Sequence, residues 1–208
     1  MVEGEVVGVE YTYDERQGPR TIVTLGNLRT RLGRYEGDKV RLSTLGGPLP
    51  DGRRLYVPEL PEIAESGRYL VFLRNDRWLY SPVLSDLALR LETVGDRAVV
   101  IDQDGRAVTG VGHGGLRRDD PALFEPVHDA KRPSAAPVLR SKDVPRAALT
   151  SDRLVAALAE YAKKEGLELT GTFAPEPDAR RVWNKVPTEP DDSVAAGTGG
   201  DEKTRSIR

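Results

Sequence analysis

The sequence predicts a mainly β protein that carries one packed helix and a disordered C-terminal tail. Short apolar runs with a period of two, separated by turns rich in Gly, Asp and Asn, fill the first half of the chain. Helical spacing occurs once, and the final segment is rich in Pro, Gly and acids but poor in apolar residues. We therefore expect a β-barrel domain over residues 2–112, an irregular linker or flap over 113–149, a helix over 150–166 and a disordered tail over 173–208.

The first strand is expected from Gly4 to Tyr13, where apolar residues alternate with small or polar ones, as in a half-buried strand. Its apolar face is predicted to consist of Val7, Val9, Tyr11 and Tyr13. The segment from Thr21 to Gly33 is again β in character. Within it, Gly26-Asn27 either kinks one long strand or turns a hairpin, and we favour the kinked strand.

The stretch GRYLVFLRNDRWLY, from Gly67 to Tyr80, holds a strand that is apolar on both faces. Tyr69, Val71 and Leu73 point one way, and Leu70 and Phe72 point the other way. A strand of this kind is buried on both sides. After an Asn75-Asp76 turn, Trp78 and Tyr80 share a face. They form either an exposed aromatic ledge for a partner or packing beneath the helix, and we favour the packing.

The remaining strands of the β domain are short. Val40 and Leu42 face the same way in one of them, and the later strands are separated by turns at Gly95-Asp96 and Asp104-Gly105. Asp-Gly between two β runs is a strong hairpin signal. The spacing of Asp102 and Asp104 also matches the first ligands of a calcium-binding loop. No further acidic ligands follow them, so a plain turn is expected.

One helix is predicted, and either Thr150 or Ser151 caps it. Its apolar residues recur at helical spacing at Leu154, Leu158, Tyr161 and Ala162. Asp152 in the first turn and two lysines in the last turn suit the helix dipole, and Gly166 stands where a C-terminal stop belongs. The apolar stripe is expected to dock on the β core.

The composition excludes several classes of function. Charged residues make up 31% of the 208 residues, yet the net charge is only -2, so both signs are interspersed on a solvated surface. The pI of about 5.8 argues against general nucleic-acid binding. The chain has no cysteine, which excludes disulfides, thiolate metal sites and cysteine nucleophiles.

The same sequence bears on localisation. We expect no membrane span, because no apolar run reaches the roughly 18 residues that a span needs. No signal peptide is visible after Met1, since a strand-like pattern begins at once. The chain as given is therefore expected to be cytoplasmic, or periplasmic or secreted if a signal peptide precedes it.

The β segments also carry a resemblance. The stretches EGEVVGVEYTYDERQGPRTIVTLGNLRTRLG, YEGDKVRLSTLGG and ESGRYLVFL resemble a largely uncharacterised family of small secreted β domains of bacteria, over roughly Val2 to Tyr80. The resemblance implies a small Greek-key barrel similar to OB-folds and to netrin-like modules, the group that includes tissue inhibitors of metalloproteases. Those inhibitors depend on an N-terminal cysteine that this chain lacks, so their mechanism does not carry over.

Basic residues crowd the early strands and are candidates for binding an oligonucleotide. OB-like barrels hold single strands with arginines and with aromatic residues on which bases stack. The candidates here are Arg29, Arg31, Tyr35 and Arg41. Acidic residues are interspersed among the bases, so we favour a solvated surface and expect no nucleic-acid partner.

The two histidines are the candidates for an enzyme. His113 lies in VGHGG and could act with Asp119 and Asp120, whereas His128 is followed directly by Asp129. Their spacing matches no zinc motif, and a glycine-flanked His113 has little to hold it in place. We interpret both as loop residues and expect no catalytic residue, metal site or cofactor.

The sequence thus predicts a non-enzymatic binding module for an unknown protein or envelope partner. Arg29, Arg31, Tyr35, Arg41, Trp78 and Tyr80 are its candidate binding residues. The alternatives are an oligonucleotide-binding barrel and a hydrolase-type enzyme built on His113 and the nearby acids. The oligomeric state is not predicted.

Overall fold

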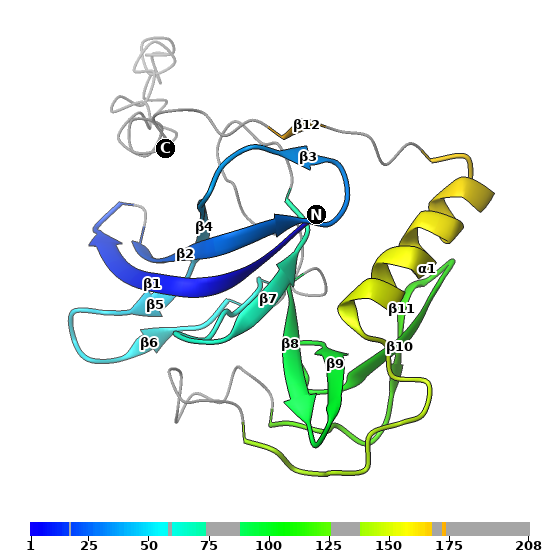
Figure 1. The fold of residues 1–208 in the computed structure, drawn as a ribbon. Coiled ribbons are helices and arrows are strands. Elements are labelled where there is room, and N and C mark those ends of the chain that lie inside the picture. The colour runs from blue at the N-terminus through cyan, green and yellow to red at the C-terminus, as the bar shows by residue number, and fades with distance from the viewer. Residues whose placement is uncertain (17, 58–59, 74–87, 126–137, 168–171, 174–208) are drawn as a thin grey trace, which may run out of the picture. The chain divides into compact units, whose positions relative to one another are not determined.

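The computed structural model describes residues 1–16, 18–57, 60–73, 88–125, 138–167 and 172–173. All of them belong to one unit, Met1–Pro175. The unit is mainly β, as predicted, and its central feature is an eight-stranded antiparallel sheet with one helix (Figure 1). In sheet order the strands are β11 (Gly115–Asp119), β10 (Ala107–Gly112), β9 (Arg97–Ile101), β8 (Ala88–Val94), β7 (Arg68–Val71), β1 (Val2–Asp14), β2 (Gly18–Thr30) and β4 (Val40–Leu45).

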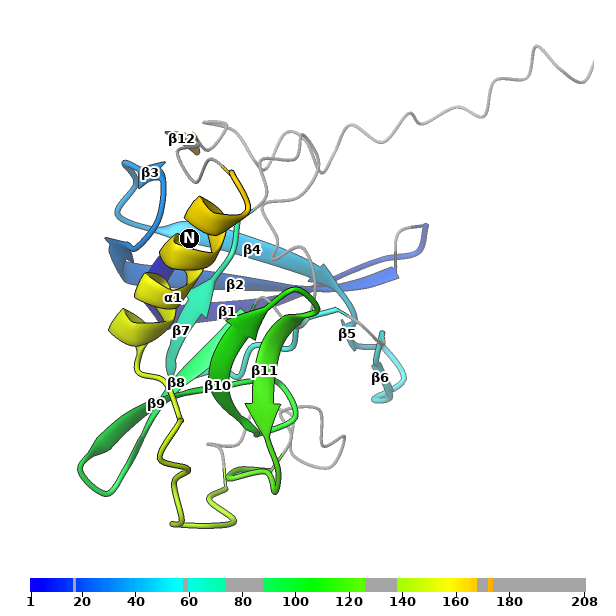
Figure 2. The same cartoon turned by 90° about the vertical axis from the view of Figure 1, so that its right-hand side faces the viewer.

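The sheet is open, which corrects the expected closed barrel. β4 and β11 form its two edges, and no pairing between them closes it within the described ranges. The strands β1, β2 and β4 run across the direction of β10 and β11, so the sheet turns strongly along its length (Figure 2). The helix, rather than a closing strand, covers one face of the second half.

Two further pairs of very short strands lie outside this sheet. β3 (Arg34–Tyr35) pairs in parallel with β12 (Thr172–Phe173), and β5 (Gly47–Pro48) pairs in antiparallel with β6 (Arg54–Leu55). The β5–β6 pair follows directly after the end of β4. The β5–β6 pair is therefore a small hairpin that lies at that end of the large sheet.

β7 is buried on both faces, as its sequence predicts. Tyr69 and Val71 join an apolar cluster with Val2, Leu25 and Leu42, whereas Leu70 joins a cluster on the other face that includes Leu154 of the helix. Leu73 and Phe72 follow the same alternation at the edges of these two clusters. Since β7 also pairs with β1 and β8, it joins the two halves of the sheet.

A third apolar cluster lies under the segment that follows β11. Leu123 and Phe124 pack there on Val99 and Ile101 of β9, together with Ala107 of β10. The backbone N–H groups of Leu123 and Phe124 both donate to the carbonyl of Gly105, at 2.8 and 3.1 Å. The predicted turn at Asp104-Gly105 is therefore present, and the segment is anchored to it.

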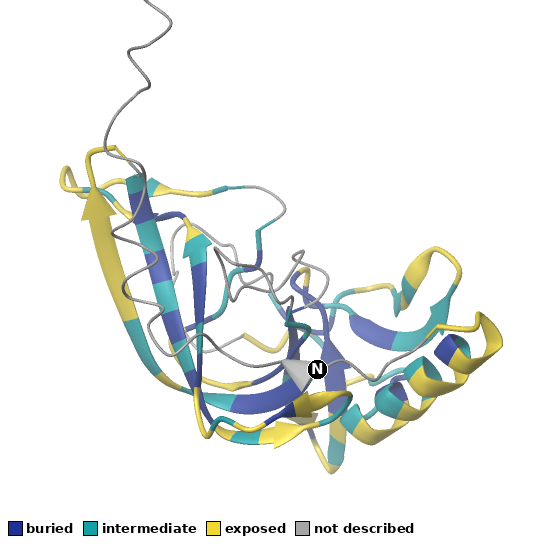
Figure 3. Cartoon of the chain, turned by 90° about the horizontal axis from the view of Figure 1, so that it is seen from above, coloured by how far each residue is buried: buried dark blue, intermediate teal, exposed yellow. Residues whose placement is uncertain are grey.

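The predicted apolar face of the first strand is correct only in part. Val9 packs on the core, whereas Val7, Tyr11 and Tyr13 are 52%, 38% and 48% exposed. A bulge between Val6 and Gly8 displaces Val7, so that Val6 packs on the core instead. Tyr11 and Tyr13 keep the register of Val9, but they belong to the exposed end of β1, beyond the residues that pair with β7 (Figure 3).

The predicted kinked strand is confirmed at Gly26-Asn27. β2 runs through both residues without a hairpin turn, and its register against β1 shifts between Glu3 and Glu5. Asn27 has a φ of 51°, a conformation that asparagine tolerates better than most residues. The side chain of Asn27 donates a hydrogen bond of 2.8 Å to Glu5.

The predicted helix is α1 (Ser151–Lys164), and Thr150 is its cap. The Thr150 hydroxyl accepts a hydrogen bond of 3.3 Å from the backbone N–H of Arg153. Gly166 has a φ of 67° just after the helix, and Leu167 N–H donates to Ala162 O at 2.8 Å, which closes the C-terminus. Leu154 is fully buried against the sheet, as predicted.

The β structure extends past the predicted boundary at residue 112. Residues expected in an irregular linker form β11, which turns back on β10 at Gly112 and Gly115. Phe124 and Leu139 also form an isolated bridge. The sequence signal fails here because β11 is rich in Arg and Gly and has no apolar period. The expected disordered tail lies outside the described residues from 174 onward.

Candidate functional site

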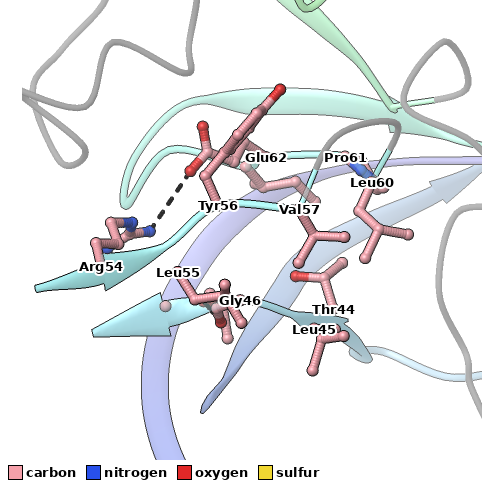
Figure 4. Close-up of a pocket in the computed structure, with 13 residues that line it drawn as sticks. Thr44, Leu45, Gly46, Arg54, Leu55, Tyr56, Val57, Leu60, Pro61 and Glu62 are labelled. Atoms are coloured by element: carbon pink, nitrogen blue, oxygen red, sulfur yellow. Dashed lines mark hydrogen bonds and ion pairs between the residues drawn. The ribbon is translucent and has the colours of Figure 1, made fainter. Parts of the chain in front are cut away.

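A small pocket opens where β4 ends and the β5–β6 hairpin begins (Figure 4). Thr21, Thr44 and Leu45 come from the large sheet, and Gly46 and Gly47 follow β4. The opposite wall is formed by Arg54, Leu55, Tyr56, Val57, Leu60, Pro61, Glu62 and Ile63. Val57 and Leu60 point toward Thr44 and Leu45 in Figure 4, so apolar and polar side chains share the lining of the pocket.

Two adjacent glycines keep this pocket open. Gly46 and Gly47 have φ values of 116° and 135°, which residues with a side chain rarely adopt. A Cβ atom on Gly47 would lie 3.0 Å from the Thr21 hydroxyl, and one on Gly46 would lie 3.0 Å from the carbonyl of Leu55. The Thr21 hydroxyl donates to the carbonyl of Gly46 at 2.9 Å, which fixes this corner.

Arg54 crosses the rim of the pocket. Its guanidinium lies 5.4 Å from the ring centroid of Tyr11 and 3.7 Å from the Glu62 carboxylate. The Tyr11 hydroxyl donates to Glu65 at 2.8 Å. Burial raises the pKa of Tyr11, and the bond to Glu65 raises it further, so the phenol stays neutral. These contacts join β1, β6 and the following loop around the pocket.

Exposed apolar side chains gather around the same pocket. Tyr11, Leu45, Leu55 and Tyr56 are 38%, 37%, 37% and 46% exposed, and we call this group the β6 patch. Tyr13 continues it along β1. Large apolar side chains that cluster on a surface mark an interaction site more often than scattered ones do. Tyrosine and arginine are also the residue types that contribute most to binding.

The size of the pocket restricts what it can hold. The enclosed part of the pocket is ≈ 20 Å³ in volume, which is about the room that one water molecule needs. The pocket is therefore a shallow recess in the surface and is too small to enclose a small-molecule ligand.

Arg31 and Tyr35 of the predicted oligonucleotide site have structural contacts. The Arg31 side chain is only 6% exposed, lies 3.5 Å from Glu3 and also pairs with Asp152. Tyr35 is buried, and its hydroxyl donates to the carbonyl of Lys39. Ser151 donates to Glu3 at 2.8 Å, so Glu3 and Arg31 tie the start of α1 to the sheet.

The other two residues of that site lie apart. Arg29 is exposed near the end of β2, and its charge adds to that of Arg31 in lowering the pKa of Asp152. Arg41 on β4 pairs with Glu10 at 3.0 Å. Three of the four candidates are thus engaged within the protein, and the four do not form one basic groove. Trp78 and Tyr80 lie outside the described residues.

The geometry around His113 does not favour the predicted alternative of a hydrolase. His113 lies exposed in the turn between β10 and β11, whereas Asp119 ends β11 and Asp120 follows it. At about 3.3 Å per residue, a strand of five residues separates them by more than 10 Å. His128 and Asp129 lie outside the described residues.

A buried polar group occurs elsewhere, around Arg90 of β8. Arg90 is 2% exposed, its Nε lies 2.8 Å from Glu92, and its guanidinium lies 5.0 Å from the ring centroid of Phe124. Burial lowers the pKa of Arg90 and raises that of Glu92. Because protein atoms enclose the guanidinium, we assign this group to packing rather than to a ligand.

Asp102 is equally enclosed. It is 2% exposed and lies 3.2 Å from Arg106 Nε and 2.9 Å from Arg118 Nε. Asp102, whose sequence context resembles the start of a calcium-binding loop, is thus paired with two arginines of the same chain. Among the described residues, no group of three or more acidic or histidine side chains could hold a metal ion.

Comparisons with protein-family models, with curated proteins and with solved structures find no match for this chain. The resemblance to secreted β domains therefore remains a prediction. Over the described residues, no helix has the length and apolar character that crossing a membrane requires.

Sequence reasoning missed the pocket and most of the β6 patch. Nothing in the composition of the stretch RRLYVP separates an exposed Leu55 or Tyr56 from a buried one. The adjacent Gly46-Gly47 is the available signal. Two glycines are also typical of an ordinary loop, and the wall that faces them is distant in sequence.

Proposed function

We propose that this protein is a non-enzymatic binding module that holds a partner protein at the β6 patch. The observation that carries the proposal is the clustering of exposed Tyr11, Leu45, Leu55 and Tyr56 around a shallow recess. An apolar side chain of the partner would rest on this surface beside Leu55. The surrounding tyrosines would cover the contact from water, as the rim of a binding hot spot does.

The polar groups at the rim support recognition rather than chemistry. Arg54 and Glu62 face each other across 3.7 Å, and the Tyr11 phenol is kept neutral by its surroundings. No nucleophile paired with a base is found among the lining residues of this pocket. An envelope or secreted partner is what the family resemblance implies.

The test is binding by a matched pair of variants. Leu55→Asp places a charge in the patch, whereas Leu167→Asp makes the same change at a residue that is 58% exposed after α1. Any partner isolated with the wild-type protein should lose at least about tenfold in affinity with Leu55→Asp, because one buried anchor commonly contributes more than 1.4 kcal/mol. Leu167→Asp should bind like the wild type, and equal binding by all three proteins would exclude the β6 patch.

A further inference from the structure

β1 is paired on both sides for only part of its length. It pairs with β2 throughout, whereas its pairing with β7 ends at Glu5 and is followed by one last hydrogen bond, from Val6 N–H to Gly67 O. Among the described residues, none forms a backbone hydrogen bond to the outer edge of β1 from Val7 to Tyr13, which we call the open edge. This end of β1 projects with β2 beyond β7 and is exposed to solvent from Glu10 onward (Figure 2).

The backbone direction along the open edge follows from Pro19 of β2. The Pro19 carbonyl accepts a hydrogen bond of 2.9 Å from the N–H of Gly46, the residue after β4, so it points away from β1. Tyr13 lies opposite Pro19, and the backbone groups of such an antiparallel pair point away from each other. Because alternate residues of a strand point the same way, the N–H and C=O groups of Val9, Tyr11 and Tyr13 all point to the open edge. These three donors and three acceptors have the spacing that a further strand requires.

The side chains beside the open edge are apolar on one face. Val9, Tyr11 and Tyr13 share that face, and Tyr11 also belongs to the β6 patch. Glu10 is the only charged residue between Val9 and Tyr13; it lies on the other face and pairs with Arg41 at 3.0 Å. β-branched and aromatic side chains favour pairing with a neighbouring strand, so a strand with apolar residues at alternate positions matches this edge.

β11, which forms one outer edge of the sheet, differs in these properties. It carries Arg117 and Arg118 among its five residues, and charged side chains at an edge oppose the addition of another chain. The Arg118 side chain also donates to the carbonyl of Leu116 at 3.0 Å. No arginine or lysine occurs between Val7 and Tyr13 of β1, so the open edge lacks this protection.

We propose that the partner binds through an extended peptide segment, which adds a strand to the open edge of β1. This inference rests on the proposed function and names the form that the partner takes. Main-chain hydrogen bonds to Val9, Tyr11 and Tyr13 would hold the segment, and its alternate side chains would rest on the tyrosines. The β6 patch lies beside the same strand, since a Cβ atom on Gly47 would lie only 3.5 Å from the ring of Tyr11.

Peptide display on the full chain tests this inference. Random peptides about 12 residues long, which span the open edge at about 3.3 Å per residue, are selected on the immobilised wild-type protein. Tyr13→Ala and Tyr13→Pro both remove the ring, but only Tyr13→Pro removes the N–H that points to the open edge. The selected peptides should bind Tyr13→Pro at least about tenfold more weakly than Tyr13→Ala, because a peptide carbonyl loses its donor. A library that yields no binder, or equal binding by the two variants, overturns the inference.

Amide hydrogen exchange of the wild type gives a readout that needs no variant. A selected peptide should slow exchange at Val9, Tyr11 and Tyr13 and leave Thr12 unchanged, because the N–H of Thr12 points to β2. Slower exchange at Leu55 and Tyr56 without any change at Tyr11 and Tyr13 overturns the added strand.

Leu55→Asp separates this inference from the proposed function. Selected peptides that Leu55→Asp weakens, but that bind Tyr13→Pro and Tyr13→Ala alike, overturn the added strand and keep the β6 patch. Peptides that only Tyr13→Pro weakens support the added strand and contradict the role of the β6 patch. Peptides that bind all of these variants like the wild type contradict both.

Discussion

Gly105 lies where a side chain has no room. A Cβ atom at this position would lie 2.1 Å from the carbonyl oxygen of Phe124, and the φ of 80° disfavours any other residue. The backbone N–H groups of Leu123 and Phe124 both donate to the carbonyl of Gly105. The turn and the segment that covers Ile101 are therefore joined at a single residue.

Gly105→Ala is expected to destabilise the protein by about 3 kcal/mol or more, because it adds a clash with backbone to an unfavourable φ. Gly52→Ala is the matched control, since Gly52 has a φ of 83° and nothing within 4 Å of the added atom. It should cost only about 1 kcal/mol. Urea denaturation measures both, and equal losses would show that the contact with Phe124 is unimportant.

The burial of Glu92 gives the protein a specific dependence on pH. Burial raises the pKa of Glu92 above its ordinary value of 4.5, and the nearby Arg90 charge opposes this only in part. The folded protein therefore binds this proton more tightly than the unfolded chain does. The contribution of Glu92 to the free energy of unfolding is present in full below pH 4.5 and is lost as pH rises through the raised pKa.

We expect Glu92→Gln to remove this dependence. Urea denaturation at intervals between about pH 4 and pH 7 should show the wild type losing stability relative to the variant as pH rises. Asp102, whose pKa burial also raises, is unchanged in both proteins and so cancels in the difference. A wild type that gains on the variant with rising pH would contradict the assigned direction.

At the scale of elements, α1 depends on one residue more than on any other. Leu154 is fully buried among Leu70, Leu89, Val100 and Val108, whereas most of the opposite face of the helix is exposed (Figure 3). The Thr150 cap and the first-turn Asp152 define where the helix begins. Helices of this length draw most of their stability from packing, so the docked face decides whether α1 persists.

Leu154→Ala should lower the free energy of unfolding by about 3 kcal/mol, since it removes a large side chain from a closed apolar cluster. Glu160→Ala, on the exposed face of the same helix, should change stability by no more than about 0.5 kcal/mol. Urea denaturation followed by circular dichroism compares the two. Similar losses would mean that α1 is not held by its buried face.

Elements with strong local signals were predictable from the sequence. β7 was found because five consecutive apolar residues need burial on both faces, and α1 was found through its caps and spacing. The exposure of Val7 was missed because a one-residue bulge leaves no mark in the sequence, and that of Tyr11 and Tyr13 because the sequence does not show where the pairing of β1 with β7 ends. β11 was missed because hydrogen bonding to β10, not an apolar pattern, makes Arg117 and Arg118 part of a strand.

The candidate site was less predictable than the fold. Arg31 and Arg41 could be recognised as basic, but their acidic partners Glu3 and Glu10 lie on another strand. The strand register decides which arginines face an acidic partner and which could bind a ligand, and the bulges set that register. The pocket beside Gly46 could not be predicted, because its opposite wall comes from residues that are distant in the sequence.

At the scale of the whole molecule, β7 couples the two halves of the sheet. Its Val71 side chain belongs to the cluster of β1, β2 and β4, and its Leu70 side chain belongs to the cluster beneath α1. If β7 detaches from the sheet, apolar side chains of both clusters become exposed to water. The two halves are therefore expected to unfold together.

Leu70→Ala tests this coupling, with an expected loss of about 3 kcal/mol. Amide hydrogen exchange should show β2 and β10 losing protection by the same factor, although Leu70 packs only on the side of α1. Loss of protection in β10 alone would show that the halves open independently.

The contact between Glu3 and Ser151 joins residues 148 positions apart in the chain. β1 can pair with β2, which follows it directly in the chain, whereas the helix that Glu3 holds is made much later. Folding rates fall as such distant contacts come to dominate. The hairpin of β1 and β2 can therefore form early in synthesis, and the docking of α1 beside it must wait until the chain reaches Ser151.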